Sequence, residues 1–292
     1  MRPAIVALGG GHGLAVALRA VREYAGEITA VVGVADDGGS SGRLRRDLHV
    51  PALGDLRRCL VALADDGPWP AAFEYRFSSG ELADHALGNL ILVGLAETLG
   101  DLTAALDEAG RTLGFVGRVL PATAGPVSMT ANVGGRLVEG QVAIASAGAH
   151  ARIRDVRLAP PDAAACPEAI DAIGRADQIV IAPGSLYTSI VAVLVVPEIR
   201  VALEKAPGQV VLVSNLATED ETEGHDGTAH FTAVRDHGGR VDRLLYDPDH
   251  GLAVDAAAIA AQGTEPIAAA IAAPGGAGHD PGQLAKSLSA LL

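Results

Sequence analysis

Short apolar runs alternate with segments of helical periodicity along most of the chain. Ala4–Leu8 is continuously apolar, and after a glycine-rich turn Leu14, Leu18 and Val21 recur at the spacing of one helix face. Ile28–Val34 is a second apolar run, typical of a parallel strand that is covered on both sides. The pattern predicts a strand, a helix and a second strand, which together form a βαβ unit.

The same alternation returns in the second half of the chain. Strands are predicted at Gln178–Ala182, Val210–Val213 and Val241–Tyr246, and helices at Pro167–Arg175, Gly227–Asp236 and Val254–Ala261. Between the two halves, residues 111–157 form short alternating segments punctuated by Gly134 and Gly135, which is typical of antiparallel hairpins. The pattern predicts an α/β fold with a mainly parallel sheet and a small antiparallel hairpin insertion at 111–157.

Polar turns follow three of the predicted strands. Gly9–Gly13 follows the first strand, Asp36–Arg43 the second, and Pro183–Ile190 the strand that ends at Ala182. Because the carboxyl ends of parallel strands share one edge of the sheet, we expect these turns to converge on one crevice. Their glycines allow backbone N–H groups to approach a phosphate, although Ser185 is equally suited to capping a helix.

The glycine turn by itself does not identify the ligand. Gly9, Gly11 and Gly13 do not complete the dinucleotide fingerprint G-x-G-x-x-G, since position 14 is leucine, and no Lys-Ser/Thr pair makes a Walker loop. A dinucleotide oxidoreductase is therefore a remote alternative.

The turn after the second strand carries the most chemistry. Asp36 and Asp37 are suited to a hard cation, and the following glycines, serines and Arg43 offer donors to an anion, although an ordinary polar turn remains an alternative. Asp55 is either a first-turn carboxylate favoured by the helix dipole or the partner of Asp36 on a metal. His85 is expected to be an ordinary polar residue near a helix start, unless its loop faces the glycines.

Composition and charge exclude several classes of function. The formal net charge of −13 opposes binding to nucleic acid or to an anionic membrane, because both gain affinity from basic residues. The chain enters its first strand without a signal-peptide h-region, and no apolar run reaches the length of a membrane span. Cys59 and Cys166 fit neither a disulfide framework nor a metal pair. We expect a cytoplasmic protein without membrane insertion.

Several motifs, taken in order, resemble one family. GGGHG, VADDGGSSGRLR, GDLRRCLVALAD, HALGNLIL, PGSLYTSI and NLATEDET resemble the YvcK-type gluconeogenesis factor (morphogenesis protein) family, which is related to the 2-phospho-L-lactate transferases. The resemblance implies a single Rossmann-like three-layer α/β sandwich over residues 1–292. It also implies a cytoplasmic regulatory protein that binds a UDP-N-acetylglucosamine-type nucleotide sugar and links central carbon metabolism to cell-wall precursor supply and cell shape.

The resemblance also assigns candidate site residues. A nucleotide diphosphate or UDP-sugar is expected to contact Gly10, Gly11, His12, Gly13, Asp37, Ser40, Ser41, Gly42, Arg43, Asn89, Gly184, Ser185, Tyr187, Thr188 and Asn215. Asp36 and Asp55 are the expected Mg²⁺ pair, and no covalently bound cofactor is expected. The chain departs from the family pattern at His12, which replaces threonine, at Gly278, which replaces arginine, and at the shortened segment Glu219–Thr222.

Two functions remain open at this stage. One is a nucleotide-sugar sensor, expected to be a homodimer, that passes its ligand state to a partner through the hairpin region. The other is a Mg²⁺-dependent transferase of phosphoryl-type groups in which Asp37 deprotonates the acceptor hydroxyl. Asn89 stands where the transferases tend to carry aspartate, and an amide cannot act as a general base. The sequence therefore favours the sensor.

Overall fold

The main sheet of the protein consists of seven parallel strands. The computed structural model describes residues 2–48 and 50–292. The strand order is β10-β9-β8-β7-β1-β2-β3, and every pairing in this sheet is parallel. The strands are β1 (Ala4–Gly9), β2 (Glu27–Val32), β3 (Arg118–Pro121), β7 (Gln178–Ile181), β8 (Gln209–Val213), β9 (Arg243–Tyr246) and β10 (Glu265–Ala268). Chain order reverses between β1 and β7, so the topological switch point lies there.

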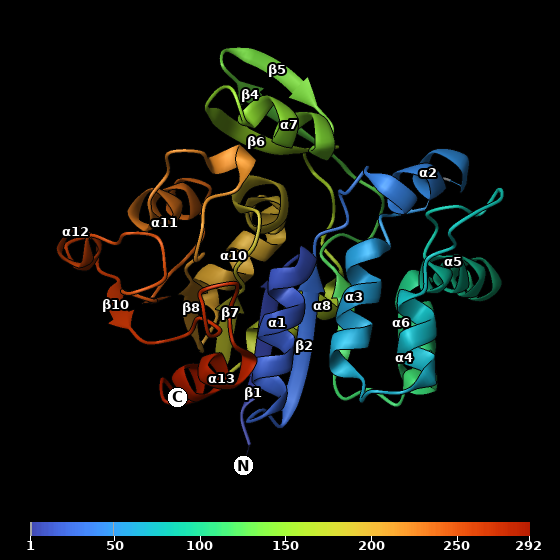
Figure 1. Cartoon of the computed structure of the whole chain (residues 1–292), viewed down its shortest axis with the longest axis horizontal. Helices are drawn as coiled ribbons and strands as arrows, with labels where there is room; N and C mark the ends of the chain where they lie inside the picture. Colours follow the sequence, from blue (N-terminus) through green and yellow to red (C-terminus); the bar gives the residue numbers. More distant parts are fainter. Residues whose placement is uncertain (1, 49) are drawn as a thin grey trace.

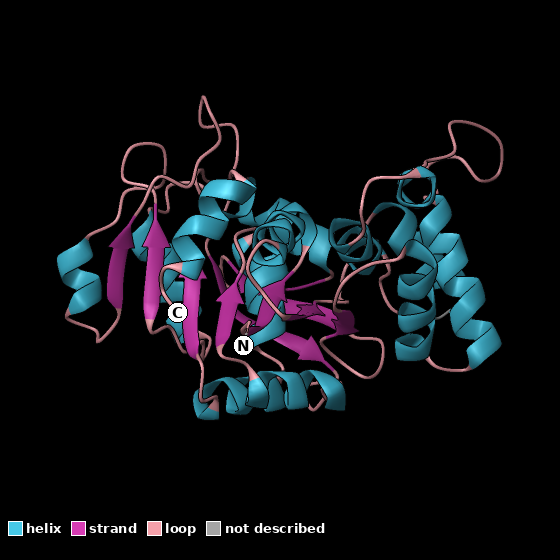
Figure 2. Cartoon of the chain, turned by 90° about the horizontal axis from the view of Figure 1, so that it is seen from below, coloured by secondary structure: helices cyan, strands magenta, loops and turns pink. Residues whose placement is uncertain are grey.

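Helices cover both faces of this sheet, as Figure 2 shows. One side carries α1 (Gly11–Arg22), α3 (Gly54–Leu63) and α13 (Pro281–Ser289), and the other carries α8 (Pro167–Arg175) and α10 (Pro197–Lys205). Strand β7 is buried along its whole length, and β1 from its second residue onward. Burial on both faces is the reason that these strands have no alternation of apolar and polar residues.

A group of helices packs beside α3 at the right of Figure 1. It contains α4 (Pro68–Glu74), α5 (Leu87–Leu99) and α6 (Leu102–Leu113), and α2 (Gly39–Leu48) lies above it. Gly100 ends α5 in the left-handed conformation at φ 70°, and the Asp101 side chain then caps α6 by accepting from the Ala104 N–H at 2.6 Å. The two adjacent caps turn the chain back on itself, so α5 and α6 pack together.

A separate antiparallel layer stands over the carboxyl ends of the main strands (Figure 1). It consists of β4 (Ser128–Val133), β5 (Arg136–Glu139) and β6 (Ile153–Ala159) in the order β5-β4-β6, with α7 (Gln141–Gly148) packed against it. The layer spans residues 128–159 rather than 111–157. The predicted start differs because Arg118–Pro121 is too short to show a period, and this segment pairs with β2 in the main sheet.

The remaining elements complete the carboxyl edge. A π-helical turn η1 (Leu186–Val191) leads into α9 (Ala192–Leu194), and further along the chain lie η2 (Asp220–Thr222), α11 (Gly227–Asp236) and α12 (Ala256–Ala260). The predicted fold class is confirmed, with a parallel sheet, two helical layers and a small antiparallel addition. Within the described ranges no single helix is long and apolar enough to cross a membrane. Two consecutive helical segments, Leu186–Leu194 and Pro197–Lys205, are together long and apolar enough, by length and composition only, and the bend between them is 73°.

Candidate functional site

The loops after β1, β7 and β8 are joined at the switch point. A Cβ atom on Gly13 would overlap the carbonyl oxygen of Pro183, so only glycine lets the first turn of α1 sit on the loop after β7. Gly184 and Asn215 then exchange two hydrogen bonds: the Gly184 N–H donates to Oδ1 at 2.9 Å, and Nδ2 donates to the Gly184 carbonyl at 2.8 Å. Asn215, in the loop after β8, therefore fixes the position of Gly184 in the loop after β7.

The N-terminus of α1 is capped by Asp55 from α3. Its Oδ2 accepts from the Gly11 N–H at 2.7 Å, and its Oδ1 accepts from Arg58 at 2.5 Å. Gly10, the N-cap residue of α1, has no side chain to offer, so the helix takes its cap from a neighbouring helix. An internal carboxylate thus occupies part of the position that the glycine loop offers to an anion.

Asp36 lies between the loop after β2 and the start of α3. Its Oδ1 accepts from the Gly38 N–H at 2.9 Å, while the neighbouring Ser41 Oγ accepts from the Gly54 N–H at 3.1 Å. Burial raises the pKa of Asp36 above its ordinary value, and the charges of Asp55 and Asp37 raise it further. A bound cation would relieve the cost of ionising Asp36, which is buried beside two other carboxylates.

Asp37 contacts the antiparallel layer. Its Oδ1 accepts from the Val142 N–H at 3.0 Å, in the first turn of α7. Gly140, just before that helix, has no room for a Cβ atom because the other carboxylate oxygen of Asp37 lies against it. Asp37, which the sequence predicts as a general base for a transferase, therefore also joins the loop after β2 to the antiparallel layer.

Ser40 and Asn89 face each other in the interior. The Asn89 Nδ2 donates to the Ser40 Oγ at 3.1 Å, and the His85 Nδ1 lies 3.0 Å from the same oxygen. The loop of His85 therefore faces the turn that contains Ser40. This is the arrangement under which His85 is expected to be more than an ordinary polar residue near a helix start. Arg43 donates to the carbonyl of Ala83 at 2.6 Å, in the same loop. Burial, followed by the charge of Arg43, lowers the pKa of His85.

The amides at the start of η1 are bonded to Glu221. Its Oε1 accepts from the N–H groups of Tyr187 at 2.9 Å and Thr188 at 3.4 Å, while burial raises its pKa. The Tyr187 ring lies 6.1 Å from the ring of His237, on the side of α11. The structure thus brings Gly184 and Asn215 to the switch point, whereas the amides of Tyr187 and Thr188 already hold a carboxylate.

The comparisons with known proteins agree with this arrangement. Residues 5–273 match the family model described as 2-phospho-L-lactate transferase CofD. The chain belongs to the CofD family. It is 43% identical over 254 residues to the gluconeogenesis factor of Bacillus subtilis, covering 85% of this chain and 80% of that protein. It is 41% identical over 239 residues to the gluconeogenesis factor of Halalkalibacterium halodurans, covering 80% and 74%.

A solved structure has the same fold over its full length. The crystal structure of a UPF0052 family member from Bacillus halodurans superposes with a TM-score of 0.94 at 34% identity, and the match covers 99% of each chain. The predicted family relationship, including its link to the 2-phospho-L-lactate transferases, is therefore confirmed. In this CofD family member the switch-point loops stand where open α/β sheets bind their ligands.

Two residues of this CofD family member make contacts that the sequence did not predict. Arg45 donates to three main-chain carbonyls, those of Ala35 at 2.8 Å, Asp36 at 3.0 Å and Val127 at 2.6 Å, and so ties the turn after β2 to the segment before β4. Glu221 lies in the acidic segment Glu219–Thr222, yet it is only 4% exposed. An acidic segment is typical of a solvated surface loop, so its sequence does not indicate a buried carboxylate.

The described residues fit a divalent cation with two protein ligands at most. Residues 2–48 and 50–292 contain no cluster of three or more histidine, cysteine, aspartate or glutamate side chains suited to a metal. Asp36 and Asp55 are the pair that the sequence predicts for such an ion, and both oxygens of Asp55 accept hydrogen bonds, from Gly11 and Arg58. Mg²⁺ commonly takes one or two carboxylates and completes its shell with phosphate and water. A cation held in this way would depend on the phosphates of a ligand.

Proposed function

We propose that the protein is a nucleotide-sugar-binding regulatory protein whose ligand is of the UDP-N-acetylglucosamine type. We further propose that it acts in the cytoplasm, as a homodimer, and links central carbon metabolism to the supply of cell-wall precursors and to cell shape. The observation that carries the proposal is the joining of the loops at the switch point, where Gly13 lies on Pro183 and Asn215 holds Gly184. The relatives' name, gluconeogenesis factor, supports the link to central carbon metabolism.

The crevice suits a diphosphate that arrives with its own cation. Asp36, Asp37 and Asp55 make this edge acidic, and Arg58 is already paired with Asp55 at 2.5 Å. A bare diphosphate would be repelled, whereas Mg²⁺ neutralises the phosphates and gives Asp36 a counter-charge. The Gly11 N–H is already bonded to Asp55, so the backbone donors for a phosphate are the first-turn N–H groups of His12 and Gly13, which have no partner within the helix.

The contact of Asp37 with α7 supplies a route from the ligand to the surface of the protein. The carboxylate belongs to the loop after β2, and its bond partner, the Val142 N–H, belongs to the antiparallel layer. A ligand that moves this loop must stretch or release the bond, because Gly140 is packed directly against the same carboxylate. The layer is therefore the element that we expect to report ligand binding to a partner.

The second candidate function is a Mg²⁺-dependent phosphoryl-type transferase, favoured by the description of the matched family model. In such a reaction Asp37 would accept the proton of the acceptor hydroxyl while the cation neutralises charge that develops on the phosphates. Two observations favour the regulatory protein instead. Asp37 is engaged with α7, and Asn89, which stands where a second carboxylate would serve the transferase, is only 1% exposed.

Calorimetric titration tests the proposal. We expect heat on addition of UDP-N-acetylglucosamine or UDP-glucose with Mg²⁺, less heat without Mg²⁺, and weaker binding of guanine nucleotides. The Asp36→Asn variant should lose the Mg²⁺ dependence, whereas the exposed Asp66→Asn variant, which changes the charge equally, should keep it. Absence of heat with every uridine nucleotide contradicts the nucleotide-sugar proposal, and product formed from a phosphorylated donor and an acceptor alcohol favours the transferase.

A further inference from the structure

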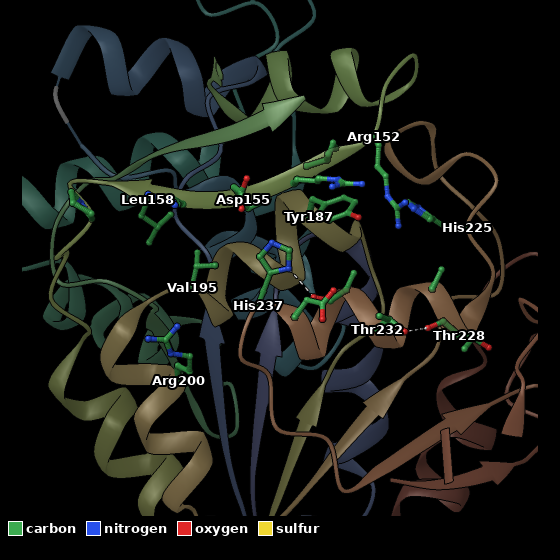
Figure 3. Close-up of a pocket in the computed structure, with 18 of the residues that line it drawn as sticks. Arg152, Asp155, Leu158, Tyr187, Val195, Arg200, His225, Thr228, Thr232 and His237 are labelled. Atoms are coloured by element: carbon green, nitrogen blue, oxygen red, sulfur yellow. Dashed lines mark hydrogen bonds between the residues drawn. The ribbon is translucent and has the colours of Figure 1, made fainter. Parts of the chain in front are cut away.

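A cavity of about 1010 Å³ lies between β6 of the antiparallel layer and α11 of the main body. Figure 3 shows Arg152, Tyr187 and His225 gathered at one end and Arg200 at the other. This volume is comparable to that of small-molecule sites in other proteins. None of the switch-point residues described above lines it apart from Tyr187, whose ring faces the cavity.

Four arginines line this cavity, in a chain of net charge −13 that has few basic residues to place. They are Arg152, Arg154, Arg157 and Arg200. All four are exposed, and in the part of the chain that the structure describes none of them forms an ion pair. Three aspartates also line the cavity, and one of them, Asp226, is used as the N-cap of α11, accepting from the Ala229 N–H at 2.7 Å. The arginines therefore retain donors for an external anion.

The local geometry of β6 is what gathers three of these arginines. Asp155 has a left-handed backbone with φ 51°, and the pairing of β4 with β6 shifts register opposite it. Without this irregularity Arg157 would alternate to the face opposite Arg154. With it, Ile153, Val156 and Leu158 are all buried, while the arginines stay on the exposed side.

The lining of the cavity also includes flat rings. The Tyr187 ring lies 6.3 Å from the ring of His225 and 6.1 Å from that of His237. Arginine side chains together with flat rings match a ligand that carries both phosphate and a ring. An added β-strand from an acidic polypeptide is disfavoured, because the kink at Asp155 interrupts the edge on which such a strand would pair.

We infer that the cavity between β6 and α11 is a second ligand site, for a phosphorylated small molecule of nucleotide size bound by Arg152, Arg154, Arg157 and Arg200. The site is independent of the proposed nucleotide-sugar crevice, and the two meet at one segment. Tyr187 faces the cavity, while its own N–H and that of Thr188 are held by Glu221 beside the loop after β7.

Inorganic pyrophosphate and ADP, titrated without Mg²⁺, are the probes for this site. Loss of two charge-assisted contacts in the double variant Arg152→Gln/Arg154→Gln should weaken pyrophosphate binding roughly tenfold to hundredfold. The matched control is Arg136→Gln/Arg175→Gln, which removes two exposed arginines outside the cavity and should bind as the wild type does. ADP should bind more tightly than pyrophosphate if the rings contribute.

A second measurement uses the unaltered protein. Pyrophosphate should slow amide hydrogen exchange in β6 and α11 and leave the Gly10–Gly13 loop unchanged. Three results would overturn the inference: absence of pyrophosphate binding, equal weakening in the two double variants, or binding that disappears in Asp36→Asn, which belongs to the crevice. Binding of polyglutamate that pyrophosphate does not displace would also overturn it and would identify a docking surface for an acidic protein.

Discussion

His230 should make the folded protein sensitive to acid. The residue lies in α11, is 5% exposed, and its Nε2 has no hydrogen-bond partner within residues 2–48 and 50–292. Burial, followed by repulsion from His225, lowers its pKa from 6.5 to about 4. Above about pH 6.5 the ring is neutral in the folded and the unfolded chain, so it costs nothing. Between the two pKa values the unfolded chain binds the extra proton, so stability falls as the pH falls.

The size of the effect follows from the same two pKa values. At about pH 5 the linkage relation gives a loss of about 2 kcal/mol relative to pH 7.5, and below about pH 4 the loss approaches about 3 kcal/mol. His230→Leu removes the titrating group and places a side chain of similar volume among Leu186, Ile190 and Leu212, which surround the site. The variant should therefore lose about 2 kcal/mol less stability than the wild type between these pH values.

Urea unfolding followed by circular dichroism at pH 7.5, 6.5 and 5.0 measures this difference. His279 titrates in both proteins and cancels in the comparison, whereas the coupling between His225 and His230, whose rings lie 6.1 Å apart, is part of the measured difference. The exposed His150→Gln variant serves as the control and should follow the wild type. The reasoning is refuted if wild type and His230→Leu lose the same stability between pH 7.5 and 5.0.

Three further predictions concern the crevice. Gly13→Ala should lower the free energy of unfolding by about 3 kcal/mol, or fail to fold, because its methyl group overlaps a main-chain carbonyl. Gly94→Ala, in open space on α5, should raise the free energy of unfolding by about 0.5–1 kcal/mol. Equal thermal midpoints in the two variants would contradict this reasoning. Asp37→Ala should cost about 1 kcal/mol and speed amide exchange in α7, and unchanged exchange would show that the contact does not hold the layer. Glu221→Gln retains an acceptor and should keep the stability of the wild type in chemical denaturation. Glu221→Ala should lose about 1–3 kcal/mol of unfolding free energy. Equal losses in the two variants would argue against the hydrogen bond from the Tyr187 N–H to Glu221.

Local patterns predicted most of the fold. The continuous apolar runs at Ala4–Leu8 and Gln178–Ala182 had to be buried on both faces, and that requirement identifies central parallel strands. The short strands β3 and β10 were not predicted, because four residues carry too little periodicity to be distinguished from a loop. The start of the antiparallel layer was misplaced for the same reason, since β3 was assigned to the insertion.

The sequence by itself determined that glycine- and aspartate-rich turns follow parallel strands, and parallel topology brings such turns to one edge. It did not determine which groups the turns would hold. Only the tertiary structure decided that Asp55 caps α1, that Glu221 takes the amides of Tyr187 and Thr188, and that Asp37 reaches α7. These are contacts between residues 33 to 105 positions apart, and a hydrogen bond of that range depends on packing rather than on neighbouring residues. The cavity lined by Arg152 and Arg200 arose in the same way, since the two residues belong to different layers.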